Sequence, residues 1–213
     1  MCLEQDCTAV IMLTNVMERG ITKCASYFPA KEGDVVGSSS LEVKNLHTSK
    51  QGEITVRKIQ ISSSVNGSLK TSALTHFHYT TWPDHGAPKD SQAIRTMCNA
   101  LPPLRRQGET VAVHCSAGIG RTGTFMAIDI TRCKLQRLNE KDAIGEEVST
   151  TTLHEALAIP DLVHELRMQR MGMVQTLEQY EFIYQALKEE LLELVSAPAV
   201  SPDDQGDGFV RSL

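Results

Sequence analysis

The sequence lacks the features of a membrane-spanning, secreted or metal-binding protein. No apolar run reaches the length of about 18 residues at which a membrane-spanning helix is predicted, and the first residues do not form a signal peptide. The six cysteines include no Cys-x-x-Cys pair and no regular framework, which favours reduced thiols over disulfides or zinc ligands. We therefore expect a soluble, cytoplasmic protein with no membrane segment in this chain, no metal and no cofactor.

The sequence also lacks an excess of positive charge. Its formal net charge of −5 gives no reason to expect nucleic acid as a partner. Aromatic residues make up only 5%, but an apolar content of 41% over 213 residues suffices for one globular domain with a sizeable core. We expect this domain to cover residues 1–195. Residues 196–213 are rich in Pro, Gly and Asp, which predicts a disordered tail.

What the sequence does contain is a glycine-containing loop between a predicted strand and a predicted helix. Residues 109–113 form a short β-branched run typical of a buried strand, and residues 123–128 have the apolar spacing of a helix. The segment between them, residues 114–122, reads His-Cys-Ser-Ala-Gly-Ile-Gly-Arg-Thr. Backbone N–H groups of such a loop can converge on one anion, and the following helix adds the positive end of its dipole. The segment therefore predicts a phosphate site at the carboxyl end of a strand.

Two side chains of this loop indicate chemistry at the bound phosphate. Cys115 would lie at the base of the anion site, where the positive field that attracts a phosphate also favours a thiolate. The planar guanidinium of Arg121 can donate to two phosphate oxygens at once. A nucleophile beneath a phosphate implies attack on phosphorus and a cysteinyl-phosphate intermediate. The alternative is a glycine-rich turn around a buried, inert cysteine.

A second motif, residues 81–88 (Thr-Trp-Pro-Asp-His-Gly-Ala-Pro), supplies a candidate acid. The oxygen that leaves phosphorus needs a proton, and the water that later attacks the phosphocysteine needs a base. One carboxyl on a movable loop can serve both steps. We predict that Asp84 is this carboxyl and that Trp82 anchors its loop. The alternative is an ordinary aspartate in a turn rich in Pro and Gly.

The motif His-Cys-x-x-Gly-x-x-Arg-Thr at residues 114–122 resembles the phosphate loop of the cysteine-dependent protein phosphatases. Three further segments narrow the resemblance to the protein tyrosine phosphatases, namely residues 16–29, 81–88 and 170–180. The resemblance covers residues 3–194 and begins part-way into the family's domain. It implies an α/β fold with a twisted mixed β-sheet flanked by helices, lacking its N-terminal part. That part would include the loop whose tyrosine stacks on the substrate ring.

The resemblance implies a two-step phosphoryl transfer from phosphotyrosine-containing proteins. Cys115 would attack while Arg121 and the loop N–H groups stabilise the equatorial oxygens, so that no metal is needed. Asp84 would protonate the tyrosyl oxygen and then deprotonate a water positioned by Gln175. The residues expected to contact the substrate are Asp84, Cys115, Ser116, Ala117, Gly118, Ile119, Gly120, Arg121 and Gln175.

The resemblance also implies supporting roles around the reacting groups. The carboxylate of Glu18 would orient the guanidinium of Arg121, and the ring of His114 would help to hold the hydrogen-bond network of the thiolate. The hydroxyls of Ser116 and Thr122 would lie near the sulfur. The supporting residues expected on this basis are Glu18, Lys23, Trp82, His114, Thr122 and Gln179.

The remaining elements are predicted from hydrophobic periodicity. Apolar runs and alternation predict strands over residues 7–14, 41–43, 54–61 and 69–79, with a hairpin turn at Asn66-Gly67. Amphipathic spacing predicts helices over residues 90–106, 159–167 and 178–194, the first of them interrupted at Pro102-Pro103. Residues 33–40 are expected to form a loop, and residues 139–152 a polar surface insertion.

Two other functions remain open from the sequence. A domain without its recognition loop can bind phosphotyrosine and yet fail to turn it over, as a regulatory fragment would. Alternatively, a shallower pocket can accept phosphoserine and phosphothreonine as well as phosphotyrosine.

Overall fold

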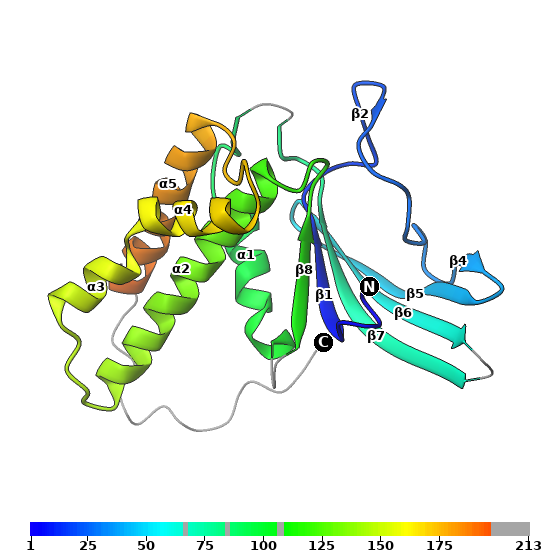
Figure 1. Ribbon diagram of the computed structural model, residues 1–213, viewed down its shortest axis with the longest axis horizontal. Helices are drawn as coiled ribbons and strands as arrows, with labels where there is room; N and C mark the ends of the chain where they lie inside the picture. The colour runs from blue at the N-terminus through cyan, green and yellow to red at the C-terminus, as the bar shows by residue number, and fades with distance from the viewer. Residues whose placement is uncertain (66–67, 84–85, 106–108, 197–213) are drawn as a thin grey trace.

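A six-stranded sheet with the strand order β4-β5-β6-β7-β1-β8 forms the centre of the fold (Figure 1). The computed structural model describes residues 1–65, 68–83, 86–105 and 109–196. The strands of this sheet are β1 (Cys7–Met12), β4 (Val35–Ser38), β5 (Leu41–Gln51), β6 (Ile54–Val65), β7 (Ser68–Tyr79) and β8 (Thr110–His114). Strand β1 runs parallel to β7 and β8, whereas β4 to β7 pair antiparallel, so the sheet is mixed as predicted.

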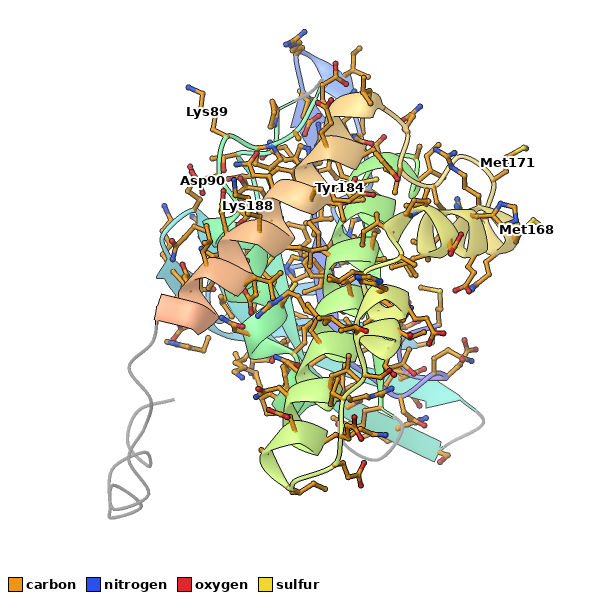
Figure 2. The ribbon with its side chains drawn as sticks, turned by 90° about the vertical axis from the view of Figure 1, so that its left-hand side faces the viewer. Lys89, Asp90, Met168, Met171, Tyr184 and Lys188 are labelled. Atoms are coloured by element: carbon orange, nitrogen blue, oxygen red, sulfur yellow. The ribbon has the colours of Figure 1, made fainter. Side chains whose placement is uncertain are left out.

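The helices gather on one side of this sheet (Figure 1). They are α1 (Gln92–Ala100), the short 3-10 helix η1 (Pro102–Leu104), α2 (Gly120–Ala143), α3 (Thr150–Ala156), α4 (Ile159–Gln169) and α5 (Leu177–Ser196). Helix α5 packs on α2, and Tyr184 and Lys188 lie on its outer surface (Figure 2). Sheet and helices together confirm the predicted α/β class. Within the described residues, no helix combines the length and the apolar character that a membrane crossing requires.

The main core lies between the sheet and the helices. Along β1 the side chains alternate between the two faces of the sheet, as expected for a strand. Ala9 and Ile11 are fully buried in the cluster that includes Phe125 of α2 and Ile183 of α5. Val10 points the other way and joins a smaller cluster. Burial on both faces explains why this strand is a continuous apolar run in the sequence.

One prediction about irregular segments is wrong in part. Residues 33–40, expected to be a loop, contain the edge strand β4, whose Gly37 has a φ of +143°. A Cβ at Gly37 would lie 2.0 Å from the carbonyl oxygen of Leu41, so the tight β4–β5 turn depends on glycine. Residues 139–152, expected to be a polar surface insertion, are largely exposed; α2 continues into them to Ala143, and α3 begins at Thr150. The hairpin turn predicted at Asn66-Gly67 lies outside the described residues.

The sheet face opposite the helices contains two buried histidines on β7, His76 and His78. Burial lowers the pKa of His76 well below 6.5, and Arg57 and the neighbouring His78 lower it further. Burial likewise lowers the pKa of His78, against a hydrogen bond to the carbonyl of Thr14 that raises it. Both rings are therefore neutral in the native protein near neutral pH.

These two histidines make stability depend on pH in a defined direction. Well above pH 6.5 both rings are neutral whether the chain is folded or unfolded, so they contribute no pH dependence there. Below pH 6.5 the unfolded chain binds protons that the native state does not, and stability falls by up to about 1.4 kcal/mol per pH unit for each histidine. Urea unfolding at pH 7.5, 6.5 and 5.5 measures this slope. It should flatten in His78→Leu and remain unchanged in His164→Gln, where the replaced ring is exposed on α4.

Candidate active site

The loop between β8 and α2 lies at the carboxyl end of a parallel strand and the N-terminus of a long helix. β8 ends at His114, α2 begins at Gly120, and Gly118 between them has a φ of +69°. This is the predicted strand–loop–helix arrangement. A cavity of about 790 Å³ opens over the loop. Its lining includes Cys115, Ser116, Lys23 and Arg170.

Cys115 lines this cavity, is buried and has one close hydroxyl donor. The hydroxyl of Thr122 donates to its Sγ over 3.2 Å. Ser116, expected to direct its hydroxyl at the sulfur as well, instead donates to the carbonyl oxygen of Lys23 over 3.0 Å. The difference arises because the segment containing Lys23 passes beside the loop and offers a main-chain acceptor. The structure therefore places one hydroxyl on the sulfur and uses the other to attach a neighbouring segment.

Arg121 is fixed by a carboxylate from a distant part of the chain. Its Nη1 and Nη2 lie 2.8 and 3.1 Å from Oε1 and Oε2 of Glu18, a bidentate pair in which both side chains are almost fully buried. Glu18 belongs to a small hairpin formed by β2 (Met17–Glu18) and β3 (Ile21–Thr22), which lies near the same end of the sheet as the loop (Figure 1). A bidentate pair fixes the plane of the guanidinium as well as its position.

The motif around Asp84 is described only on its two sides, because Asp84 and His85 lie outside the described residues. On one side, the carbonyl of Pro83 accepts from Nη2 of Arg121 over 3.2 Å. On the other, the indole N–H of Trp82 donates to the carbonyl of Gly86 over 3.3 Å. The ring of Trp82 is buried, with its centre 6.0 Å from that of Phe182. Pro83 thus connects the segment to Arg121, and the buried ring of Trp82 anchors it in the core and bonds to Gly86.

Gln175 and Gln179 lie against the first residue of α2. A Cβ built on Gly120 would be 3.1 Å from Oε1 of Gln175 and 3.0 Å from Nε2 of Gln179. The buried Gln179 accepts the backbone N–H groups of Gln175 and Thr176 over 2.9 and 3.4 Å. Gln179 therefore fixes the backbone of Gln175, whose carboxamide lies beside the loop.

The segment before Gln175 has a strained conformation that the sequence did not indicate. Val174 has a φ of +58°, which is costly for a β-branched residue. Its N–H donates to the carbonyl of Ile119 in the loop over 3.2 Å. The guanidinium of Arg167 donates to the carbonyls of Met173 and Val174 over 2.9 and 2.8 Å. These contacts fix the approach of Gln175 to the loop.

The close approach of Val174 to α2 requires a glycine at position 123. A Cβ there would lie 2.5 Å from the backbone nitrogen of Val174, so the alanine variant must push the two segments apart. We expect Gly123→Ala to lower the free energy of unfolding by about 1–3 kcal/mol, as overpacking does. Urea unfolding measures this loss. Gly145→Ala is a useful comparison because the same Cβ meets open space there, leaving only the cost of a positive φ.

His114 links the loop to the opposite face of the sheet through a residue to which the sequence assigned no role. Its Nδ1 lies 3.0 Å from the carbonyl oxygen of Cys115, and its Nε2 lies 2.6 Å from the hydroxyl of Tyr27. Tyr27 is part of the motif at residues 16–29, but its contact with His114 could be identified only from the structure. Burial raises the pKa of the Tyr27 hydroxyl, so this group stays protonated.

The surroundings of the cavity contain further exposed apolar residues. Met168 and Met171 project from the end of α4 and the turn after it (Figure 2). Between them in the chain, Arg170 donates to the carbonyl of Ala117 over 3.2 Å.

No group of three or more His, Cys, Asp or Glu residues with the geometry of a metal site occurs in the part of the chain that the structure describes.

Comparison with known protein families assigns the chain to a family. The family model described as protein-tyrosine phosphatase matches residues 1–189. The chain belongs to the protein-tyrosine phosphatase family. This confirms the resemblance inferred from the four motifs.

Individual relatives in the protein-tyrosine phosphatase family agree with this assignment. The chain is 35% identical over 198 residues to protein-tyrosine-phosphatase PTP1 of Arabidopsis thaliana, covering 92% of this chain and 54% of the relative. It is 35% identical over 191 residues to tyrosine-protein phosphatase 2 of Dictyostelium discoideum, covering 90% and 47%. It is 34% identical over 194 residues to the human receptor-type tyrosine-protein phosphatase eta, covering 88% and 13%. The chain thus spans about half the length of the first two relatives.

Proposed function

We propose that residues 1–195 form a catalytic domain that hydrolyses phosphotyrosine in proteins through a cysteinyl-phosphate intermediate. The observation that supports this best is the placement of Cys115 Sγ beside the N-terminus of α2, with the guanidinium of Arg121 fixed by Glu18 at the same loop. A sulfur nucleophile and a planar, oriented cation at one anion site suit in-line attack on phosphorus. We further propose a cytoplasmic location, because all six cysteines are free thiols, as is usual in a reducing compartment.

The first step transfers the phosphoryl group to the enzyme. Cys115 Sγ attacks phosphorus, the bond to the tyrosyl oxygen breaks, and Asp84 gives that oxygen a proton. Arg121 and the backbone N–H groups of Ser116, Ala117, Gly118, Ile119 and Gly120 bind the three equatorial oxygens. In this scheme the guanidinium and the backbone N–H groups stabilise the negative charge that spreads over these oxygens.

The second step regenerates the thiolate. Gln175 orients a water, which Asp84 deprotonates as it attacks phosphorus, and the P–S bond breaks. The hydroxyl of Thr122 stabilises the departing sulfur, to which it already donates. A carboxamide suits the role of Gln175 because it binds water without competing as a nucleophile. Lys23 and Trp82 support the loops at the rim of the site.

Turnover and trapping together test this function. The chain should release phosphate from p-nitrophenyl phosphate and from a phosphotyrosine peptide without added metal and in the presence of a chelator. Acid quenching during turnover should trap a phosphoenzyme, and mass spectrometry should place the phosphate on the peptide containing Cys115. Absence of both turnover and phosphoenzyme from folded protein would leave a phosphotyrosine-binding fragment as the function.

Substrate selectivity needs its own measurement. Competition between matched peptides with phosphotyrosine and phosphothreonine should favour phosphotyrosine by at least about 100-fold in kcat/KM, since the shorter phosphothreonine side chain brings its phosphate less far toward the buried Cys115. Comparable values for the two peptides would instead assign the chain a broader specificity.

A further inference from the structure

A line of hydrogen bonds connects a buried histidine on β7 with the loop that contains the nucleophile. Nε2 of His76 lies 3.0 Å from the hydroxyl oxygen of Tyr27. That oxygen lies 2.6 Å from Nε2 of His114, whose Nδ1 lies 3.0 Å from the carbonyl oxygen of Cys115. His76 is only 1% exposed and does not border the cavity over Cys115. It therefore has no direct access to a substrate.

The carbonyl of Cys115 at one end and His76 at the other favour the same direction of the hydrogen bonds along the line. A carbonyl oxygen can only accept, so the contact with Cys115 requires a proton on Nδ1 of His114. In the neutral ring, Nε2 of His114 is then an acceptor, and the proton of the 2.6 Å contact must come from Tyr27. The oxygen of Tyr27 is left to accept from Nε2 of His76. Every donor in the line is paired when the protons are arranged this way.

The surroundings of His76 support the same arrangement. Among the described residues its Nδ1 is a buried atom without a hydrogen-bond partner. The ring packs on that of Phe28, with centres 4.6 Å apart, and Arg57 lies over the same phenyl ring. In the opposite arrangement this Nδ1 would bear an unpaired N–H, and a lone pair of His114 would face the carbonyl of Cys115. Buried unpaired N–H groups are rarer in proteins than buried unpaired acceptors.

We propose that His76 is a positioning residue that fixes the tautomer of His114 through the hydroxyl of Tyr27, and thereby the orientation of the peptide group after Cys115. Its Nε2–H occupies the oxygen of Tyr27, so the hydroxyl proton of Tyr27 is directed at His114. Met12 Sδ, 3.7 Å from the same hydroxyl, is another acceptor, and a thioether accepts weakly. Without His76, Tyr27 can either donate to His114 or accept from it.

The proposal can be tested on the unmodified protein first. Two-bond 1H–15N correlation spectra near neutral pH distinguish the two neutral tautomers of each histidine. They should show Nδ1–H on His114 and Nε2–H on His76. Nε2–H on His114, or Nδ1–H on His76, would overturn the proposal without any variant having to fold.

Replacement of His76 is the second test, with a matched control on the same strand. His76→Leu should convert His114 to a mixture of tautomers. His78→Leu removes a neighbouring buried ring that bonds to the carbonyl of Thr14 and should leave the tautomer of His114 unchanged. In a Tyr27→Phe background, adding His76→Leu should have no further effect on His114, because the connection is already broken. A folded His76→Leu protein in which His114 keeps only Nδ1–H would contradict the proposed role.

The kinetic consequence rests on the proposed function. His76→Leu should lower kcat for p-nitrophenyl phosphate roughly fivefold, the equivalent of one net hydrogen bond, with KM changed less than about twofold. If the wild-type chain shows no turnover, the proposed function fails but the tautomer test still decides the role of His76. A loss of kcat without a change in the tautomer of His114 would show that His76 acts on the site in another way.

Discussion

Cys115→Ser is expected to lower kcat for aryl phosphates by at least about 10⁴-fold, the scale observed when a covalent nucleophile is removed. A serine hydroxyl at this position is not ionised near neutral pH, and an alkoxide is a poorer leaving group than a thiolate in the second step. Binding should persist, because the backbone N–H groups of the loop and Arg121 remain. Phosphate release measures the loss of kcat, and fluorescence anisotropy of a labelled phosphotyrosine peptide measures the retained binding.

Cys133→Ser provides a matched control for this change. Cys133 lies on α2, partly buried, and its sulfur accepts from Arg105 over 3.4 Å. The same thiol-to-hydroxyl change there should alter kcat by less than about twofold, since it touches no reacting group. Undiminished turnover in Cys115→Ser would eliminate the cysteinyl-phosphate mechanism. If the wild-type chain bound the peptide and never turned it over, the site would serve only for recognition.

Arg121→Lys is expected to reduce kcat about 10³-fold even though the charge is retained. The ammonium group of lysine is a compact point charge and cannot make the paired contacts of a guanidinium with phosphate oxygens. The structure adds a second reason, because Nη1 and Nη2 of Arg121 are shared among Glu18 and the carbonyls of Leu13 and Pro83. Lysine would leave the buried carboxylate of Glu18 with fewer donors. Steady-state kinetics with p-nitrophenyl phosphate measures the effect.

Arg137→Lys on the same helix separates the specific role from general charge effects. Arg137 lies about 24 Å further along α2, given the rise of about 1.5 Å per residue, and should tolerate lysine with kcat unchanged. Glu18→Gln adds a test of orientation: it retains the shape of the partner but removes its charge. If Arg121→Lys retained nearly full activity, a bidentate contact with phosphate would not be part of the transition state.

The outline of the loop could be predicted from the sequence because its determinants are local. The strand that ends at His114, the helix that starts at Gly120 and the glycine between them all lie within a few residues of Cys115, and periodicity with turn chemistry defines them. The pairing of Glu18 with Arg121 is different. These residues are 103 positions apart, and only the family resemblance brought them together before the fold was known.

Other features could not be predicted because they arise from tertiary packing. The positive φ of Val174 is imposed by its contacts with Ile119 and Gly123, and valine itself gives no hint of it. The relation of Tyr27 to His76 likewise depends on a segment that crosses the face of the sheet. In each case residues distant in the sequence determine the backbone conformation or the hydrogen-bond partner, and the residue type alone does not indicate it.

The hairpin of β2 and β3 has a consequence for how the protein can be inactivated. Its strands have two residues each, and Met17 and Ile21 are about 60% exposed, so apart from the Glu18–Arg121 pair few buried contacts oppose its opening. Yet it supplies the carboxylate of Glu18 that orients Arg121. The hairpin can therefore detach while the helices and sheet remain intact, and catalysis should fail at a lower temperature than the one at which the core melts. A phosphate analogue that binds Arg121 should narrow the interval between these two temperatures, because its binding stabilises the conformation in which the hairpin is closed.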